Sequence, residues 1–185
     1  MPEPAQHPGF KLEQISGRTI VRVRVRPGAV ETAIYAIRLP RELCWSGEDP
    51  IAHWCGPDQW LLTSDTKAAK DIIQSIHINM PDQLHAATDM SSGYVCFALS
   101  GPAARTILAM GCGIDMHAGA FMTGYCAQTH FANVQLLIVA IDDNSFNLYV
   151  DRSHANYLND WLVNAGDDPM TRLDQQTSSE YNEPI

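Results

Sequence analysis

The chain has 185 residues and a mass of 20.4 kDa, and its 45% hydrophobic and 18% charged residues exclude disorder throughout and indicate one ordinary domain or two small ones. The net charge of −9 and the isoelectric point near 5.0 oppose binding to phosphate backbones, so no nucleic-acid partner is expected. The five cysteines are odd in number and form no CxxC pair, which favours reduced thiols over a disulfide framework.

Neither a membrane span nor a secretory signal is predicted. The apolar run Leu136–Ile141 is far shorter than the roughly 18 to 20 residues that cross a bilayer. The N-terminal segment MPEPAQHPGF carries prolines and a glutamate before any apolar stretch, unlike a secretory signal. We therefore expect a cytoplasmic chain without a membrane partner.

The first predicted element is a strand over Arg18–Arg26, because apolar and basic residues alternate there with a period of two. The valines and Thr19 share one face, which we expect to be core, and Ile20 and four arginines share the other. The arginine face has two interpretations: a solvated strand whose charges prevent edge pairing, or a surface for an acidic partner.

Pro27-Gly28 ends this strand, and the apolar-rich segment Thr32–Leu39 that follows is predicted to pair with it as a hairpin. Residues 43–63 are expected to be irregular until a strand at Gln59–Thr63. Ser64 or Asp65 then caps a helix over Thr66–Ile76. The apolar stripe of that helix consists of Ala69, Ile72, Ile73 and Ile76.

The second half alternates strands with two helices. Ser100-Gly101-Pro102 and a C-terminal cap at Gly111 bound a short helix across Ala103–Met110. After a cap at Ser153, a last helix over His154–Ala165 buries Tyr157, Leu158, Trp161 and Leu162. Strands are predicted at Tyr94–Leu99, Thr123–Phe131, Val134–Ile141 and Phe146–Val150.

These elements predict an α+β fold with mainly antiparallel sheets covered by helices. We divide it into a strand-rich N-terminal half with one helix (1–88) and a C-terminal α+β half (89–166). The acidic segment 167–185 has almost no large apolar groups and is expected to be disordered when alone.

No catalytic motif is evident. The sequence lacks a G-x-S-x-G elbow, and Gly111-Cys112-Gly113 has neither the third glycine nor the lysine of a phosphate-binding loop. Cys112, His117, Cys126 and His130 are potential soft metal ligands, but their spacing differs from that of a zinc finger. We expect them to have structural roles, with metal binding as the alternative.

Three of the four tryptophans lie within residues 45–60, two of them flanking the turn Gly56-Pro57-Asp58. Tryptophan is frequent both in cores and at interaction hot spots. We expect Trp60 to be core and Trp54 to be interface, and we predict that Arg22, Arg24 and Trp54 contribute to assembly with a partner.

Over about residues 51–166 the chain resembles the gamma subunits of heterotetrameric sarcosine oxidases, a family related by fold to the folate-binding domains of aminomethyltransferase T-proteins. The resemblance rests on Trp54–Leu62, Asp89-Met-Ser91, Leu99–Arg105 with Gly111–Asp115, Cys126-Ala-Gln-Thr129, and Arg152–Leu158 with Trp161-Leu162. Two departures from T-proteins are evident. The hairpin Ala132–Leu137 has no carboxylate, so aminomethyl transfer by this chain alone is not expected, and Tyr125 replaces a basic residue.

The resemblance implies a noncatalytic subunit of a complex with alpha, beta and delta subunits that oxidatively demethylates sarcosine or a related N-methyl amino acid. FAD, FMN and NAD would belong to the large subunits and zinc to delta. Tetrahydrofolate would accept the carbon, and this chain would hold none of these cofactors. A stand-alone folate-binding protein of the T-protein superfamily is the alternative. Which N-methyl amino acid is the substrate, whether the complex is an oxidase or a dehydrogenase, and its stoichiometry are left open.

Overall fold

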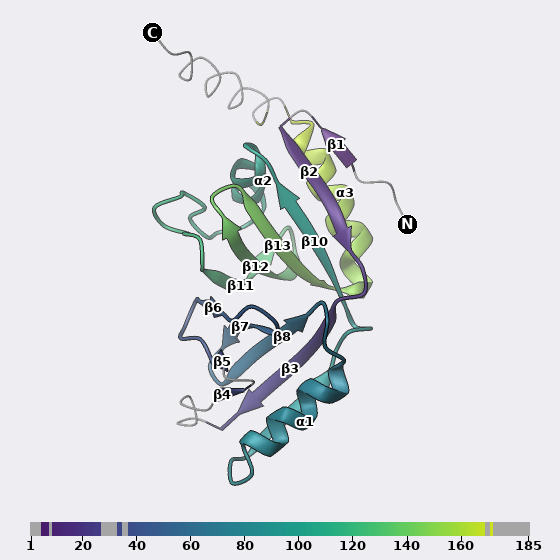
Figure 1. Ribbon diagram of the computed structural model, residues 1–185. Helices are drawn as coiled ribbons and strands as arrows, with labels where there is room; N and C mark the ends of the chain where they lie inside the picture. Colours follow the sequence, from purple (N-terminus) through teal and green to yellow (C-terminus); the bar gives the residue numbers. More distant parts are fainter. Residues whose placement is uncertain (1–4, 8, 27–32, 35–36, 169–170, 172–185) are drawn as a thin grey trace.

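The computed structural model describes residues 5–7, 9–26, 33–34, 37–168 and 171. Within them the chain forms two large antiparallel sheets, one above the other in Figure 1, with helices on their outer sides. This is the α+β arrangement that the sequence predicted.

The upper sheet in Figure 1 has six strands, and its two helices, α2 (Ala104–Gly111) and α3 (Ala155–Gly166), pack on the same face. A short 3-10 turn, η1 (Arg152–His154), leads into α3. In spatial order the strands are β1 (Ala5–His7), β2 (Phe10–Ile15), β10 (Tyr94–Ser100), β13 (Ser145–Asp151), β12 (Val134–Asp142) and β11 (Cys126–Phe131). Strand β2, near the start of the chain, and helix α3, near its end, therefore contribute side chains to the same core.

The lower sheet has five strands and is covered by α1 (Ala69–Asn79). In spatial order the strands are β6 (Trp45–Ser46), β7 (Ile51–Gly56), β8 (Gln59–Ser64), β3 (Thr19–Val25) and β9 (His85–Asp89). A small hairpin of β4 (Ala33–Ile34) and β5 (Ile37–Arg38) forms a sheet of its own. The chain enters the lower sheet after β2 and returns to the upper sheet at β10. Segments before residue 88 therefore contribute to both sheets. The predicted division into two halves at residue 88 stays a prediction.

Period-two alternation sorts side chains into three apolar layers. Val21, Val23 and Val25 of β3 point toward α1, whereas Ile20 points toward the other sheet. On the opposing sheet Leu137 belongs to the layer between the sheets. The core between the sheets joins Ile20 and Leu61 to Cys96, Cys126, Leu137, Val139 and Tyr149. The two sheets thus face each other across a packed interface.

The strand predicted at Arg18–Arg26 is confirmed as β3, but its predicted neighbour is wrong. β3 pairs with β8 and β9 and lies inside the sheet, so its arginines do not protect an edge. In the segment 32–39, the described residues form the separate β4–β5 hairpin. Residues 43–63 are also more regular than expected, because β7 lies among them.

The helix predicted at Thr66–Ile76 is present as α1, shifted by three residues at each end. Its N-cap is Ala68 without a side-chain bond, while the hydroxyl of Ser64 accepts the amides of Thr66 and Lys67 in the preceding turn. Ile72 and Ile76 are fully buried, as the stripe predicted.

In the second half the four predicted strands are confirmed, with β11 beginning at Cys126 rather than Thr123. Gly111 is not the left-handed cap that we expected but the last residue of α2. An added Cβ there would lie 2.4 Å from the Phe131 ring, so close packing explains the glycine. Helix α3 begins without a side-chain cap from Ser153.

The burial predicted for α3 is correct at two of four positions. Leu158 and Leu162 are fully buried, and Trp161 is partly exposed with its ring edge-on to Phe131 at 4.7 Å between centroids. Tyr157 was predicted to be buried, but it is 44% exposed and its hydroxyl donates to the carbonyl of Ala132. Most of the acidic segment 167–185 lies outside the described residues.

Candidate functional site

The arginine face of β3 points into the space between the two sheets, which neither sequence interpretation anticipated. Arg18 and Arg22 are half-buried, whereas Arg24 and Arg26 are exposed at the far end of the strand. The two inner arginines each reach a tyrosine of the upper sheet. The sheets are therefore joined by polar contacts as well as by their apolar core.

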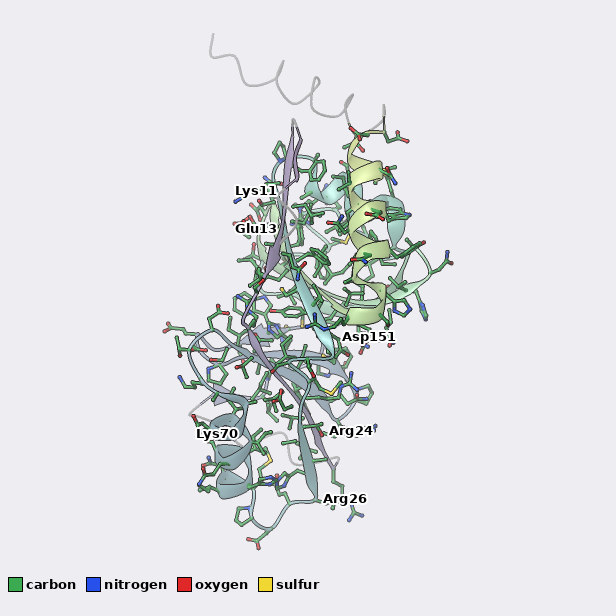
Figure 2. All side chains as sticks on the ribbon, turned by 90° about the vertical axis from the view of Figure 1, so that its right-hand side faces the viewer. Lys11, Glu13, Arg24, Arg26, Lys70 and Asp151 are labelled. Carbon is green, nitrogen blue, oxygen red and sulfur yellow. The ribbon has the colours of Figure 1, made fainter. Side chains whose placement is uncertain are left out.

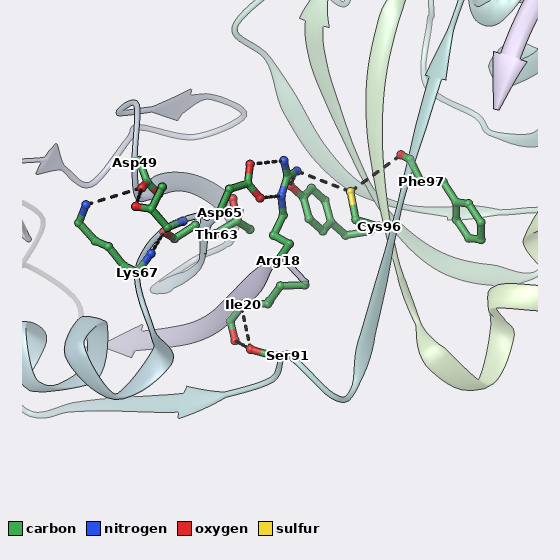
Figure 3. Close-up of polar contacts among 12 residues, drawn as sticks. Arg18, Ile20, Asp49, Thr63, Asp65, Lys67, Ser91, Cys96 and Phe97 are labelled. Atoms are coloured by element: carbon green, nitrogen blue, oxygen red, sulfur yellow. Dashed lines mark hydrogen bonds and ion pairs between the residues drawn. The ribbon is translucent and has the colours of Figure 1, made fainter. Parts of the chain in front are cut away.

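Arg18 is the centre of the first polar cluster (Figure 3). Its guanidinium makes a bidentate pair with Asp65, with both nitrogen–oxygen distances 2.8 Å. The same group donates to the hydroxyl of Tyr149 at 2.9 Å and to the thiol of Cys96 at 3.8 Å. Burial disfavours the charge of Arg18, but its hydrogen bonds to Asp65 together with its electrostatic interactions with Tyr149, Cys96 and Asp65 outweigh burial and hold its pKa above the ordinary value. In return, Arg18 lowers the pKa of Asp65.

His53 lies next to this cluster and is 1% exposed. Its Nε2 is 3.0 Å from the Thr63 hydroxyl, and its ring is 5.4 Å from that of Tyr149. No described residue bonds to its Nδ1. Burial, assisted by the positive charge of Arg18, lowers the pKa of His53 to about 3, so this histidine is neutral at physiological pH.

The second polar cluster surrounds a cavity of about 250 Å³ between the sheets. Arg22 projects toward the upper sheet, where its guanidinium donates to the hydroxyl of Tyr94 and lies 5.6 Å from the centre of that ring. Arg22 forms no ion pair with any described carboxylate within 4.0 Å. The remaining polar lining consists of Gln59, Gln128, Gln135, Tyr149, Asp151 and Cys55.

The thiols between the sheets are structural in character. Cys126 donates to the carbonyls of Cys44 and Trp54, at 3.1 and 3.4 Å, and so joins β11 to the lower sheet. Burial raises the pKa of Cys126 and of Cys55 to about 12 and that of Cys96 to about 11. A nucleophilic cysteine needs a lowered pKa, so these protonated thiols are poorly suited to covalent catalysis.

Two motifs singled out in the sequence fix the backbone near these clusters. The carboxylate of Asp89 accepts the amide and hydroxyl of Ser91, which lowers the pKa of Asp89, and the Ser91 hydroxyl accepts the amide of Ile20 at 3.0 Å. Arg105 donates to the carbonyls of Met116, Phe121 and Asp143 and thereby pins the long loop before β11. Both motifs have a structural use here.

The structure brings together two of the three residues predicted to contact a partner. Arg22 and Arg24 share the inter-sheet face of β3. Trp54 pairs in register with Trp60, which pairs with Val23, and its side chain packs against both the core beneath α1 and the core between the sheets. Trp60 is 3% exposed and core, as predicted, and donates to the carbonyl of Pro40. Whether Arg22, Arg24 and Trp54 touch a partner stays a prediction.

Two of the four candidate soft ligands, Cys126 and His130, lie on β11, and the other two, Cys112 and His117, lie in the loop between α2 and β11. Cys112 donates to the carbonyl of Leu108, Cys126 lies between the sheets, and His117 and His130 are exposed. Within the described part of the chain no three His, Cys, Asp or Glu side chains form a group that could hold a metal ion. Among the same residues no helix has the length and apolar character needed to cross a membrane.

Comparison with known proteins gives concordant matches. A model of the "Sarcosine oxidase, gamma subunit family" matches residues 27–168. Sarcosine oxidase subunit gamma from Corynebacterium sp. (strain P-1) is 27% identical over 162 residues, covering 84% of this chain and 79% of that protein. Its counterpart from Arthrobacter sp. is 27% identical over 163 residues, covering 83% of this chain and 78% of the relative.

Two solved structures share the fold. Heterotetrameric sarcosine oxidase from Corynebacterium sp. U-96, in complex with pyrrole 2-carboxylate, contains a chain that superposes with a TM-score of 0.76 at 22% identity, covering 84% of this chain and 83% of that chain. Glycine cleavage system aminomethyltransferase T from Bartonella henselae superposes with a TM-score of 0.61 at 15% identity, covering 84% of this chain and 45% of the transferase. The fold relation to T-proteins that the sequence predicted is thereby confirmed.

Proposed function

Because the chain belongs to the sarcosine oxidase, gamma subunit family, we propose that it is the gamma subunit of a heterotetrameric enzyme that oxidatively demethylates sarcosine or a related N-methyl amino acid. The observation that carries this proposal is the family match over residues 27–168, joined to a fold shared along most of both chains with a sarcosine oxidase structure. The matched relatives are gamma subunits of sarcosine oxidases, so they do not favour the alternative that this chain is a stand-alone folate-binding protein.

Within the complex this chain has a structural role and is not itself catalytic. Its half-buried Arg18 is committed to Asp65 and Tyr149, and the thiols of Cys55, Cys96 and Cys126 are protonated by burial. His53 is buried and neutral. Arg18, Cys96 and Cys126 take part in hydrogen bonds between the two sheets, and each of these groups lacks the exposure or the pKa that a nucleophile or general base requires.

The flavins, NAD, zinc and tetrahydrofolate of the complex are assigned to its other subunits. The inter-sheet cavity has about 250 Å³, less than the roughly 300–1,000 Å³ of pockets for drug-sized ligands, and so does not fit a dinucleotide or a folate. The partners of this chain are then the alpha, beta and delta subunits, with its main contact on the folate-binding part of alpha.

This proposal is tested by co-expressing the tagged full chain with the products of the neighbouring reading frames. We expect a single species on gel filtration in which the chain travels with flavin-bearing partners. A chain that elutes alone from every such preparation contradicts the proposal. Titration of the isolated chain with tetrahydrofolate separates the alternative, because a free-standing binder binds folate without partners.

For the interface we propose that Arg22, Arg24 and Trp54 contribute to assembly and that Arg24 makes the direct contact, since it alone of the three is exposed. Reversing its charge in Arg24→Glu should lower the yield of assembled complex at low salt by about tenfold, the effect of losing roughly 1.4 kcal/mol. The yield is measured by pull-down on a tagged partner subunit.

The matched control is Lys70→Glu, which makes the same charge reversal on exposed α1. Figure 2 shows Lys70 and Arg24 on opposite sides of the lower half of the molecule. The control should assemble like the parent chain. Equal yields for Arg24→Glu and Lys70→Glu would remove the arginine from the interface.

A further inference from the structure

The cavity between the sheets collects polar side chains that the rest of the structure does not use. Asp151, Gln59, Gln128 and Gln135 line it, and their side chains make no hydrogen bond or ion pair with any other described residue. Asp151 and Gln59 are half-buried and Gln128 and Gln135 are exposed, so water satisfies these groups in the free chain and a ligand of matching polarity can replace that water. The convergence of these four groups from four strands on one cavity is the observation from which we infer a ligand.

The cavity also carries one positive and one negative group on different sheets. Arg22 belongs to β3 of the lower sheet, and the Tyr94 hydroxyl and ring fix its guanidinium in place. Asp151 ends β13 of the upper sheet, in register with Tyr94, and lies at the level where the two sheets meet (Figure 2). Arg22 has no carboxylate within 4.0 Å among the residues that the structure describes, so its charge is available to a ligand.

Volume limits the ligand to a compact molecule. Since a water molecule takes up about 30 Å³ in the liquid, about 250 Å³ admits a ligand of a few heavy atoms with some ordered water. An anion alone would face the carboxylate of Asp151, and a cation alone would face the guanidinium of Arg22. A molecule that carries a positive and a negative charge a few bonds apart can pair with both Asp151 and Arg22.

We propose that this cavity binds a small amino acid in its zwitterionic form. The ligand carboxylate accepts from the guanidinium of Arg22, its ammonium donates to the carboxylate of Asp151, and the three glutamine amides supply further donors and acceptors. Of the residues proposed to contribute to assembly, Arg22 lines this cavity, whereas Arg24 and Trp54 do not.

The test is calorimetric titration of the full chain, without partners, with glycine, acetate and methylammonium. Glycine should bind saturably and at least about tenfold more tightly than either ion, because it alone makes both charge-assisted contacts. Acetate binding as tightly as glycine would reduce the cavity to an anion site and overturn the proposal. If the titration with glycine gives no saturable heat, the cavity holds only water and the proposal is wrong.

Single substitutions test whether glycine binds in this cavity. Asp151→Asn changes the charge with almost no change in shape and should weaken glycine binding about tenfold or more while leaving acetate binding no weaker. Arg22→Met should abolish binding of both. Arg24→Gln removes the exposed arginine two residues along the same strand and should leave glycine binding unchanged. Glycine affinity that survives Asp151→Asn contradicts the assignment. Because no partner subunit is present, this outcome is independent of whether the proposed function holds.

Discussion

Replacing Gly101 by alanine should destabilise the fold by about 3 kcal/mol or more. Gly101 joins β10 to α2 with φ of +118°, a conformation that side chains rarely adopt. An added Cβ would also lie 2.6 Å from the carbonyl oxygen of Gly9 and 2.9 Å from the Cα of Phe10. Both obstacles are backbone atoms, so no side chain can move away to relieve the collision.

The matched control is Gly113→Ala, where an added Cβ meets nothing within 4 Å and φ is outside the left-handed region. Its stability should stay within about 0.5 kcal/mol of the parent. Denaturant unfolding followed by circular dichroism gives both values. Equal stability of the two variants would mean that the contact between Gly101 and the Gly9–Phe10 backbone is not formed.

The second large effect is a loss of stability in mild acid caused by His53. Its pKa is about 3 in the folded chain and about 6.5 when exposed, so between these values the unfolded state binds a proton that the folded state does not. The contribution of His53 to stability is therefore complete only well above pH 6.5 and is lost as the pH is lowered through 6.5. Linkage gives a loss of about 2 kcal/mol between pH 8 and pH 5.

The measurement is the free energy of unfolding at half-unit pH steps from 8 to 5. His53→Gln keeps a hydrogen-bonding group opposite Thr63 but cannot titrate, so the stability of the variant should lose the slope that His53 gives the parent in this window. The lowered pKa values of Asp49, Asp65 and Asp89 act at lower pH and do not interfere. The same slope in both proteins would show that His53 is not buried in its neutral form.

Local patterns in the sequence were sufficient to predict β3, β8, β10, β11, β12, β13 and all three α-helices, because periodicity and turn residues are encoded within a few positions. The strands β1, β2, β6, β7 and β9 were missed. Of these, β2 has a readable alternation, since Phe10 and Leu12 are buried while Lys11 and Glu13 are exposed, whereas β7 shows no such alternation and is marked only by the turn that follows it. The burial predicted for Tyr157 failed because a tyrosine can keep its hydroxyl at the surface, here on the carbonyl of Ala132.

The site could not be predicted in the same way, because its contacts join distant parts of the chain. Arg18 bonds to Asp65, 47 positions away, and to Tyr149, 131 positions away. The alternation around Arg22 defined a face but could not show that a second sheet covers it. Only strand order, which depends on non-local pairing, decides whether such a face meets solvent or protein.

This chain is proposed to work through assembly rather than by its own chemistry. Glycine formation from sarcosine, measured in parallel for the purified full chain and for the complex with its partner subunits, tests that proposal most directly. We expect turnover by the complex and none by the chain alone. Turnover by the isolated 185-residue chain would contradict it.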